Sequence, residues 1–225
     1  FTISNCVTKW RGGGIYVNPG AWTAQVVNCV ISGNTAYDDA GNTPEGGAFY
    51  AGFAGRFGLL VSNCVFRDNF AGNLVQTNLG RAGAILINST GRKHITQSLF
   101  EDNGAANAGG AVVTLGLSYL EMDHCTLRRN HTTMYTNAAS GGGAIFLDNS
   151  GLLDLRNSLI YDNWTFGIGR GGAINTQTRG SNYVLYVYNS TIVSNRSASA
   201  AIYARAVSAA NGGTPPLYMV NSIVQ

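Results

Sequence analysis

The chain is 225 residues long, which is enough for one large hydrophobic core or two ordinary domains. Glycine accounts for 30 residues, proline for only 4, and 11% of residues are charged, which excludes a collagen-like chain and a disordered polar tract. The net charge of +3 comes from Arg and Lys scattered along the whole length, so we expect no nucleic-acid partner, and no apolar run approaches the ~20 residues of a membrane span.

A short element rich in glycine and alanine recurs along the chain. Each copy has three small residues followed by an apolar one, and successive copies start 34, 36, 27, 33, 29 and 28 residues apart. Residues without bulk are expected where a coil of chain turns tightly and passes close to a neighbouring coil. The copies occupy residues 12–15, 46–49, 82–85, 109–112, 142–145, 171–174 and 199–202.

A second element lies between these copies, and its internal spacing never changes. It starts with Cys or Ser, has an apolar residue two positions later and an asparagine five positions later. We expect the asparagines of successive copies to stack as a ladder of side-chain amides at one corner of the fold. They are Asn34, Asn69, Asn103, Asn130, Asn163 and Asn195.

A bend is expected just before the Cys or Ser of each copy. An apolar residue stands three positions upstream, and along one straight strand the two residues could not both face inward. The residue between them is mostly asparagine, which tolerates left-handed backbone, so we expect a second ladder at this bend. The bend residues are Asn5, Asn28, Asn63, Gln97, His124, Asn157, Asn189 and Asn221.

These repeats predict an all-β fold, a right-handed single-stranded parallel β-helix. We expect about seven coils of about 31 residues, with three strands in each coil and loops of variable length at the corners. Neither end of the sequence carries a cap, so we expect residues 1–225 to form a single β-helix domain that is a fragment of a longer extracellular protein.

The alternating Gly-Gly-Ala-Ile and Phe-x-x-Asn repeats resemble the polymorphic outer membrane proteins of chlamydiae. They are similar also to other β-helical surface proteins, including autotransporter passengers and eukaryotic cell-surface fibres. Residues 109–112 with 100–103 fit this pattern closely, as do residues 66–69, and the likeness covers nearly the whole chain. The resemblance implies adhesion or surface display and brings no catalytic residues with it.

All four cysteines occupy one position of the second element, where other copies have serine. We expect a small inward-facing residue at this position, and cysteine serves as a small apolar filler. Parallel stacked side chains hold their Cβ atoms farther apart than a disulfide prefers, so free buried thiols are expected. The cysteines are Cys6, Cys29, Cys64 and Cys125.

Two groups of acidic residues are candidates for chemistry. Asp38, Asp39 and Glu45 fall in one loop, where their oxygen atoms could bind calcium. Asp68 and Asp102 share a register on adjacent coils, about 5 Å apart, a separation that would suit a retaining glycosidase.

The alternative for the second pair is structural. Neighbouring positions Arg67, Glu101 and Arg128 alternate in sign along the stack, so the acids can belong to an exposed charge ladder that contributes little to stability.

Aromatic residues in or beside the variable loops are candidate binding residues. Tyr37, Tyr135, Trp164 and Phe166 could stack on sugars or bury in a partner, or they could pack over the corners of the fold. Of five N-glycosylation sequons, Asn88 is the expected glycan site of a secreted eukaryotic protein, because the others fall on the expected ladders.

We therefore predict a non-catalytic extracellular or cell-surface module without a cofactor: an adhesin, an autotransporter passenger or a fibre component. Its expected partners are glycans or proteins of a host or neighbouring cell surface, and other copies or modules of the same assembly. The alternative is a carbohydrate-active enzyme, a polysaccharide lyase or glycoside hydrolase. β-Helix pectin-degrading enzymes are similar in architecture, but we find no counterpart in the expected strands for their clustered aspartates or their Gly-His-Gly run.

Overall fold

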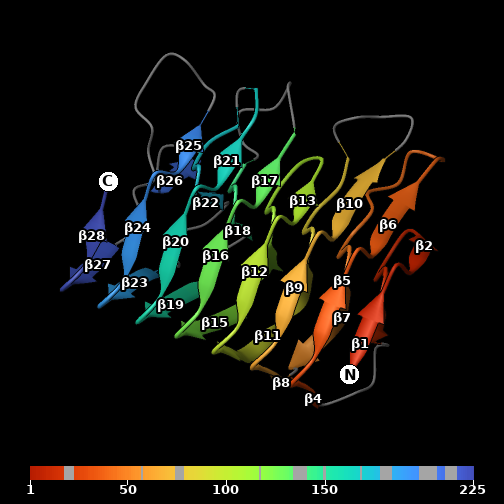
Figure 1. The fold of residues 1–225 in the computed structure, drawn as a ribbon, viewed down its shortest axis with the longest axis horizontal. Coiled ribbons are helices and arrows are strands. Elements are labelled where there is room, and N and C mark those ends of the chain that lie inside the picture. The colour runs from red at the N-terminus through yellow and green to blue at the C-terminus, as the bar shows by residue number, and fades with distance from the viewer. Residues whose placement is uncertain are drawn as a thin grey trace.

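The structure is a stack of short parallel strands. In this computed structural model the described residues are 1–17, 23–56, 58–73, 79–116, 118–133, 141–148, 151–167, 169–177, 184–197, 207–210 and 217–225. Every strand pair in these ranges is parallel, and they contain no helix (Figure 1). The chain advances along the long axis of the molecule from one terminus to the other, as an all-β parallel solenoid.

Three sheets make up the walls of the solenoid. The first sheet has eight strands: β1 (Thr2–Ser4), β5 (Val30–Ser32), β9 (Val65–Arg67), β12 (Leu99–Glu101), β16 (Thr126–Arg128), β20 (Leu159–Tyr161), β24 (Thr191–Val193) and β28 (Ile223–Val224). The second sheet has seven: β2 (Val7–Lys9), β6 (Thr35–Asp38), β10 (Phe70–Asn73), β13 (Gly104–Ala105), β17 (His131–Thr132), β21 (Trp164–Thr165) and β25 (Arg196–Ser197).

The third sheet consists of two rows of strands. Row 3a contains β3 (Ile15–Val17), β7 (Phe49–Arg56), β14 (Val112–Leu115), β18 (Ile145–Asp148), β22 (Ile174–Gln177) and β26 (Val207–Ala210). Row 3b contains β4 (Thr23–Val27), β8 (Gly58–Ser62), β15 (Ser118–Asp123), β19 (Leu152–Arg156), β23 (Val184–Tyr188) and β27 (Leu217–Val220). Strand β11 (Ile85–Thr96) runs through both rows and joins them into one sheet.

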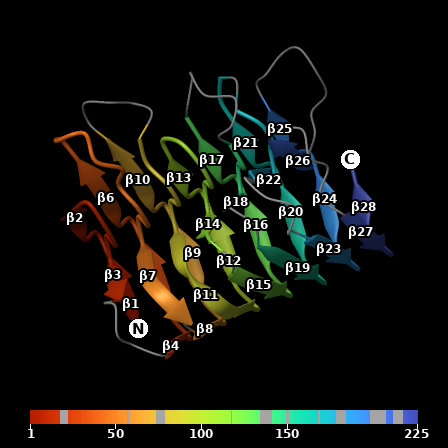
Figure 2. The same cartoon turned by 180° about the vertical axis from the view of Figure 1, so that it is seen from behind.

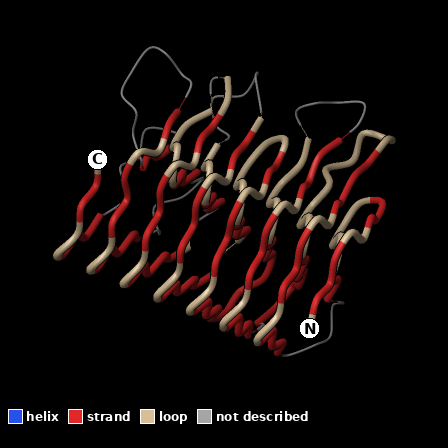
Figure 3. The backbone as a smooth tube through the Cα atoms, viewed as in Figure 1, coloured by secondary structure: helices blue, strands red, loops and turns tan. Residues whose placement is uncertain are grey.

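Two details differ from the fold expected from the repeats. In the described residues a coil contributes four strand segments instead of three, because its strands in rows 3a and 3b are separate; the coil of β11, which runs through both rows, contributes three. About five coils, from β5 to β23, are covered by a neighbour on both sides, whereas the expected seven also counted the terminal repeats (Figures 2 and 3).

The core is built from residues that repeat in register. Phe100 pairs with Phe66 on one side and with Leu127 on the other, and all three side chains are fully buried. The rings of Phe66 and Phe100 are stacked, with centroids 4.9 Å apart and planes 3° from parallel. Residues separated by about one repeat therefore occupy equivalent places in the core, as the sequence pattern predicts.

The six asparagines form a continuous ladder inside the corner between the first and second sheets. The Nδ2 amide of each of the first five donates to the Oδ1 atom of the asparagine in the next coil, at 2.9–3.0 Å. The same Oδ1 atoms also accept a backbone N–H from the preceding coil, and each Nδ2 donates a further bond to a backbone carbonyl. Because these side chains are almost completely buried, every such bond satisfies a polar group that water does not reach.

The predicted bend before each Cys or Ser is confirmed by the backbone. All eight bend residues have left-handed φ angles, between 47° and 56°. The predicted amide ladder at this bend is only partial: Asn63 donates to Asn28 at 2.8 Å and Asn189 to Asn157 at 3.3 Å, and both pairs are exposed. A second left-handed row directly precedes the ladder asparagines and contains Gly33, Asp68, Asp102, Arg129, Asp162 and Ser194.

Glycines of the first repeat element lie where backbones approach closely. A Cβ atom on Gly143 would lie 2.1 Å from the carbonyl oxygen of Gly172 and 2.7 Å from the amide nitrogen of Trp164. Gly110 is equally crowded by Gly143 and His131. Any side chain here would force adjacent coils apart, so glycine is required by the close packing of the stack.

The charged side chain of Lys93 is fully buried in the solenoid. Lys93 in β11 stands in register with Leu59 and Leu120, and its Nζ donates to the carbonyls of Ser89, Thr90 and Gly91 at 2.7–2.9 Å. Burial lowers the pKa of Lys93 to about 8. The ammonium group thus ties down the corner where rows 3a and 3b meet in β11.

Replacing Asn130 with alanine should strongly destabilise the fold. The substitution removes two donated and two accepted hydrogen bonds and leaves the buried backbone N–H of Asn103 without this acceptor, while its Nδ2 keeps the bond to the Phe66 carbonyl. We expect a loss of about 4 kcal/mol in the free energy of unfolding, measured by urea denaturation. The exposed control Gln25→Ala should change it by about 0.5 kcal/mol or less; an equal effect of both substitutions would contradict the role of the ladder.

Candidate functional site

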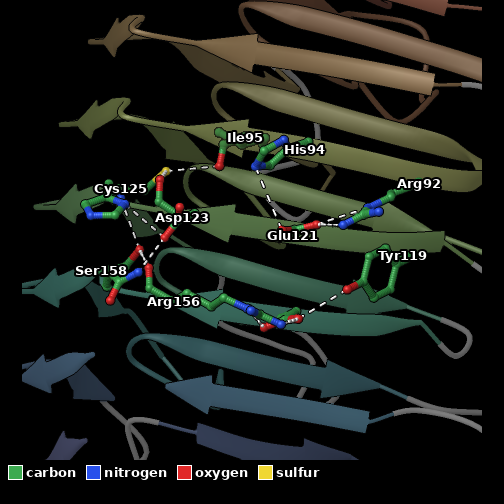
Figure 4. A network of polar contacts seen from close by, with 12 residues as sticks. Arg92, His94, Ile95, Tyr119, Glu121, Asp123, Cys125, Arg156 and Ser158 are labelled. Atoms are coloured by element: carbon green, nitrogen blue, oxygen red, sulfur yellow. Dashed lines mark hydrogen bonds and ion pairs between the residues drawn. The ribbon is translucent and has the colours of Figure 1, made fainter. Parts of the chain in front are cut away.

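The outer face of row 3b carries a column of polar side chains. His94, Glu121 and Asp154 occupy equivalent positions on the adjacent strands β11, β15 and β19. Figure 4 shows the polar contacts that surround this column, with His94 Nε2 lying 4.0 Å from Glu121 Oε1. This is the place where the structure gathers acidic and basic side chains on one strand face.

Each carboxylate of this column is bound by an arginine. Arg92 donates from Nε to Glu121 Oε2 at 3.0 Å, and a second guanidinium nitrogen contacts the same oxygen. Arg156 binds both oxygens of Asp154, at 2.8 and 2.7 Å, and the hydroxyl of Tyr119 donates to Asp154 Oδ2 at 3.2 Å. The side-chain hydrogen bonds and negative charge of the carboxylates raise the pKa of both arginines above its ordinary value.

Aromatic rings extend the same face. The guanidinium of Arg92 lies 5.3 Å from the ring centroid of Tyr119, and that of Arg156 lies 5.4 Å from that of Tyr188. Burial raises the pKa of Tyr119, and the charge of Asp154 and its hydrogen bond act in the same direction. The result is a charge-neutralised surface whose acids are occupied by guanidinium groups and Tyr119, an arrangement that supports rigidity better than proton transfer.

This column was not predicted from the sequence. No cluster of acids on a strand face was expected, yet Glu121 and Asp154 lie in register on adjacent strands. The signal was available, because His94, Glu121 and Asp154 each precede the Cys or Ser of their repeat by four positions. Reading the outward-facing positions of the repeat, as well as its inward ones, would have found them.

The three acids considered for calcium have separate partners. Asp38 Oδ2 accepts the backbone amides of Ala40 and Asn42, Asp39 pairs with Lys9, and Glu45 lies between Arg11 and Arg81. Burial would raise the pKa of Asp38, but the hydrogen bonds from Asn42 and Ala40 outweigh it and lower the pKa; for Glu45 burial prevails, and its pKa is raised despite the two arginines. Within the described ranges no group of three or more His, Cys, Asp and Glu is placed to hold a metal ion.

The Asp68 and Asp102 pair occupies left-handed turns. Both residues precede a ladder asparagine and have φ angles of 56° and 55°. Arg129 binds both oxygens of Asp102 at 2.9 Å and also contacts Glu101, which is paired with Arg128 as well. Glu101 and Asp102 thus form part of a network of ion pairs on the surface of the stack.

The second sheet carries a shallow groove lined by aromatic and charged residues. The rings of His131 and Trp164 are stacked, with centroids 4.6 Å apart, and Phe166 meets Trp164 edge-on at 5.9 Å. Among the predicted binding residues, the structure thus brings Trp164 and Phe166 together, and it adds His131 beside them. The in-register signal was present in the sequence, since His131 and Trp164 each follow a ladder asparagine directly.

The other predicted binding and modification residues lie elsewhere. Tyr37 is half-buried on β6, four strands from Trp164 in the second sheet, and Tyr135 lies outside the described residues. Asn88 is exposed on β11, where its side-chain amide forms a hydrogen bond with Tyr50. Three of the other sequon asparagines, Asn130, Asn163 and Asn195, hold the buried ladder.

The Cys or Ser of each repeat lies directly after the left-handed bend that separates row 3b from the first sheet. All four cysteines are free thiols; Cys64 and Cys125 are buried, while Cys6 and Cys29 are partly exposed. Where serine follows in the next coil, its hydroxyl accepts a backbone amide, as from Cys64 to Ser98 at 3.1 Å and from Cys125 to Ser158 at 3.0 Å. Burial raises the pKa of Cys64 and raises that of Cys125 to about 12.

Comparison with known proteins gives two distant relatives. Over 129 residues, 56% of this chain, it is 28% identical to the probable autotransporter YfaL of Escherichia coli (strain K12), of which the match covers 10%. This chain is a parallel β-solenoid that is similar to part of a probable autotransporter.

The second relative comes from a eukaryote. Over 136 residues, 60% of the chain, it is 28% identical to the metabotropic glutamate receptor-like protein R of Dictyostelium discoideum, of which the match covers 7%. The solenoid therefore spans a tenth or less of the length of the curated relatives described here. No family model and no solved structure matches the chain. No helix in the described part of the chain is long and apolar enough to cross a membrane.

The cysteines should differ in reactivity with iodoacetamide at pH 8. The thiolate is the reacting form, and burial both shields Cys64 and Cys125 and raises their pKa values. Mass spectrometry of the native protein should find carboxamidomethyl groups on Cys6 and Cys29 first, and on all four residues in urea. Labelling of Cys125 as fast as that of Cys6 would show that this corner opens to solvent.

Proposed function

We propose that this chain is a non-catalytic extracellular module of a surface protein, which serves as an adhesive or structural segment. The observation that carries the proposal is the likeness to a probable autotransporter over 56% of the chain, found on a solenoid whose repeats are tied together by one ladder. The similarity to a receptor-like protein also supports a cell-surface or secreted location.

The finer parts of this proposal rest on the repeat and on general rules. Crossovers between parallel strands are right-handed in nearly all proteins, so we propose a right-handed coil. The Gly-Gly-Ala-Ile and Phe-x-x-Asn repeats support a surface protein of the polymorphic outer membrane type, or a fibre of similar construction. Its partners would be glycans or proteins of another cell surface and further modules of the same assembly, with Asn88 as a glycan site in a eukaryotic source.

A stiff solenoid suits such a role for a physical reason. Each coil contacts only the coils before and after it, so the stack grows in one dimension and holds its side chains in fixed columns. Outward-facing side chains such as His94 and Glu121 stand in register on adjacent strands, so a partner meets them at the spacing of the coils. A stiff stack can hold binding groups at a distance from a cell, and side chains in fixed columns can contact a partner without a deep pocket.

Surface exposure is tested on the cells that produce the protein. Antibodies raised against residues 1–225 should label intact, unpermeabilised cells, and protease treatment of those cells should remove the signal. An antibody to a cytosolic protein of the same cells serves as the control for intact membranes. Labelling that appears only after permeabilisation would contradict the proposal.

A second candidate function is a carbohydrate-active enzyme, because Glu121 and Asp154 lie one strand apart beside His94. Incubation with polygalacturonate and other acidic polysaccharides should give no new reducing ends or unsaturated products, since both acids are held by arginines. Turnover that disappears in Glu121→Gln and Asp154→Asn, or in Asp68→Asn and Asp102→Asn, would establish the enzyme instead.

A further inference from the structure

The groove on the second sheet has the size and the walls of a ligand site. Three short strands, β17, β21 and β25, form its floor, and their residues His131, Trp164 and Arg196 are in register. Its volume of about 940 Å³ falls at the upper end of the range typical of pockets for small ligands. Asp102 and Asp162, from the left-handed row, line it as well.

Its aromatic part is held in place before any ligand arrives. Trp164 stacks on His131 with planes 9° from parallel, and Phe166 meets Trp164 at 70°. Burial lowers the pKa of His131 and so favours the uncharged form of its ring. Phe166 remains 42% exposed, so a ring-shaped ligand can reach an apolar surface whose side chains lose little conformational entropy on binding.

The charged residues of the groove balance one another. Arg129 is engaged by Asp102 and Glu101, whereas within the described part of the chain the side chains of Asp162 and Arg196 have neither a hydrogen bond nor an ion pair. Carboxylates would repel an anionic ligand and guanidinium groups a cationic one. A ligand rich in hydroxyl groups suits both, because a hydroxyl donates to a carboxylate and accepts from a guanidinium.

We propose that this groove binds a neutral oligosaccharide. The apolar face of a pyranose ring would lie against Trp164 and Phe166, while adjacent hydroxyl groups would donate to Asp162 and accept from Arg196. Saccharide binding by this groove does not require surface display. The binding test and the cell-surface labelling test can therefore fail independently of each other. If the module is displayed on a surface, the groove would supply its adhesive contact.

The test uses the full chain and defined sugar probes. Isothermal titration calorimetry with cellohexaose, chitohexaose and mannohexaose would be compared with hexagalacturonate, which has a similar length and carries negative charge. In a Trp10→Phe and Trp22→Phe background, Trp164 is the one remaining tryptophan, and its fluorescence reports a ligand in the groove. We expect saturable binding of at least one neutral hexaose and a matching fluorescence change.

Matched variants decide whether the groove is the site. Asp162→Asn and Arg196→Gln should each raise the dissociation constant about tenfold, and Trp164→Ala should abolish detectable binding. Asp68→Asn, at the equivalent turn outside the groove, and Arg67→Gln should leave it unchanged. Because Trp164→Ala could disturb the stack, circular dichroism and the urea midpoint are measured for every variant. If Trp164→Ala does not fold, Asp162→Asn and Arg196→Gln still decide the test.

Three results would overturn the proposal. They are an absence of binding by every neutral hexaose, equal or tighter binding of hexagalacturonate, and an effect of Asp68→Asn as large as that of Asp162→Asn. Any one of them would remove the groove as a neutral-saccharide site.

Discussion

The structure depends on the transfer of hydrogen bonds from one coil to the next through buried asparagine side chains. Each ladder asparagine accepts from the coil before it and donates to the coil after it, so a single residue type satisfies the backbone at a corner where the strands end. This works only if every coil places its asparagine at the same height and angle. This requirement explains why the ladder asparagine always stands five positions after the Cys or Ser of its repeat.

The same register determines what the surface can do. Side chains about one repeat apart in the chain become neighbours in a column, whether they form the core, as Phe66 and Phe100 do, or the outer face, as Glu121 and Asp154 do. On the outer face of row 3b the column is neutralised by arginines, which makes it a stable surface. In the groove near Trp164 the pairing is incomplete, since the side chains of Asp162 and Arg196 lack partners among the described residues, and this is why we propose a ligand site there.

Much of the fold could be predicted because its constraints are local and repeated. The left-handed bends follow from the change of side-chain parity before each Cys or Ser, and the in-register core follows from the constant position of residues such as Phe100. The division of the third sheet into two rows could not be predicted in this way. Among the described residues, β11 is the strand that runs through both rows, and its Lys93 binds the carbonyls of Ser89, Thr90 and Gly91 there.

The site was predicted less completely, for a related reason. Outward-facing positions vary in residue type from coil to coil, so His94 and Asp154 do not look like copies of one element until the register is known. Trp164 and Phe166 could be predicted because aromatic side chains near loops are common binding residues. Arg196 could not, because its place beside Trp164 results from strand pairing. Tyr37 is also aromatic, but it lies on β6, four strands away from Trp164 in the second sheet.

The most direct test of this account is hydrogen exchange of asparagine side chains, followed by NMR on ¹⁵N-labelled protein. The Nδ2 protons of Asn69, Asn103, Asn130 and Asn163 should exchange slowly, and through-space contacts should connect each amide to the asparagine of the next coil. The exposed amides of Asn28 and Asn63 should exchange quickly. If the ladder amides exchange as fast as the exposed ones, the coils are not held together by these side chains and the account is wrong.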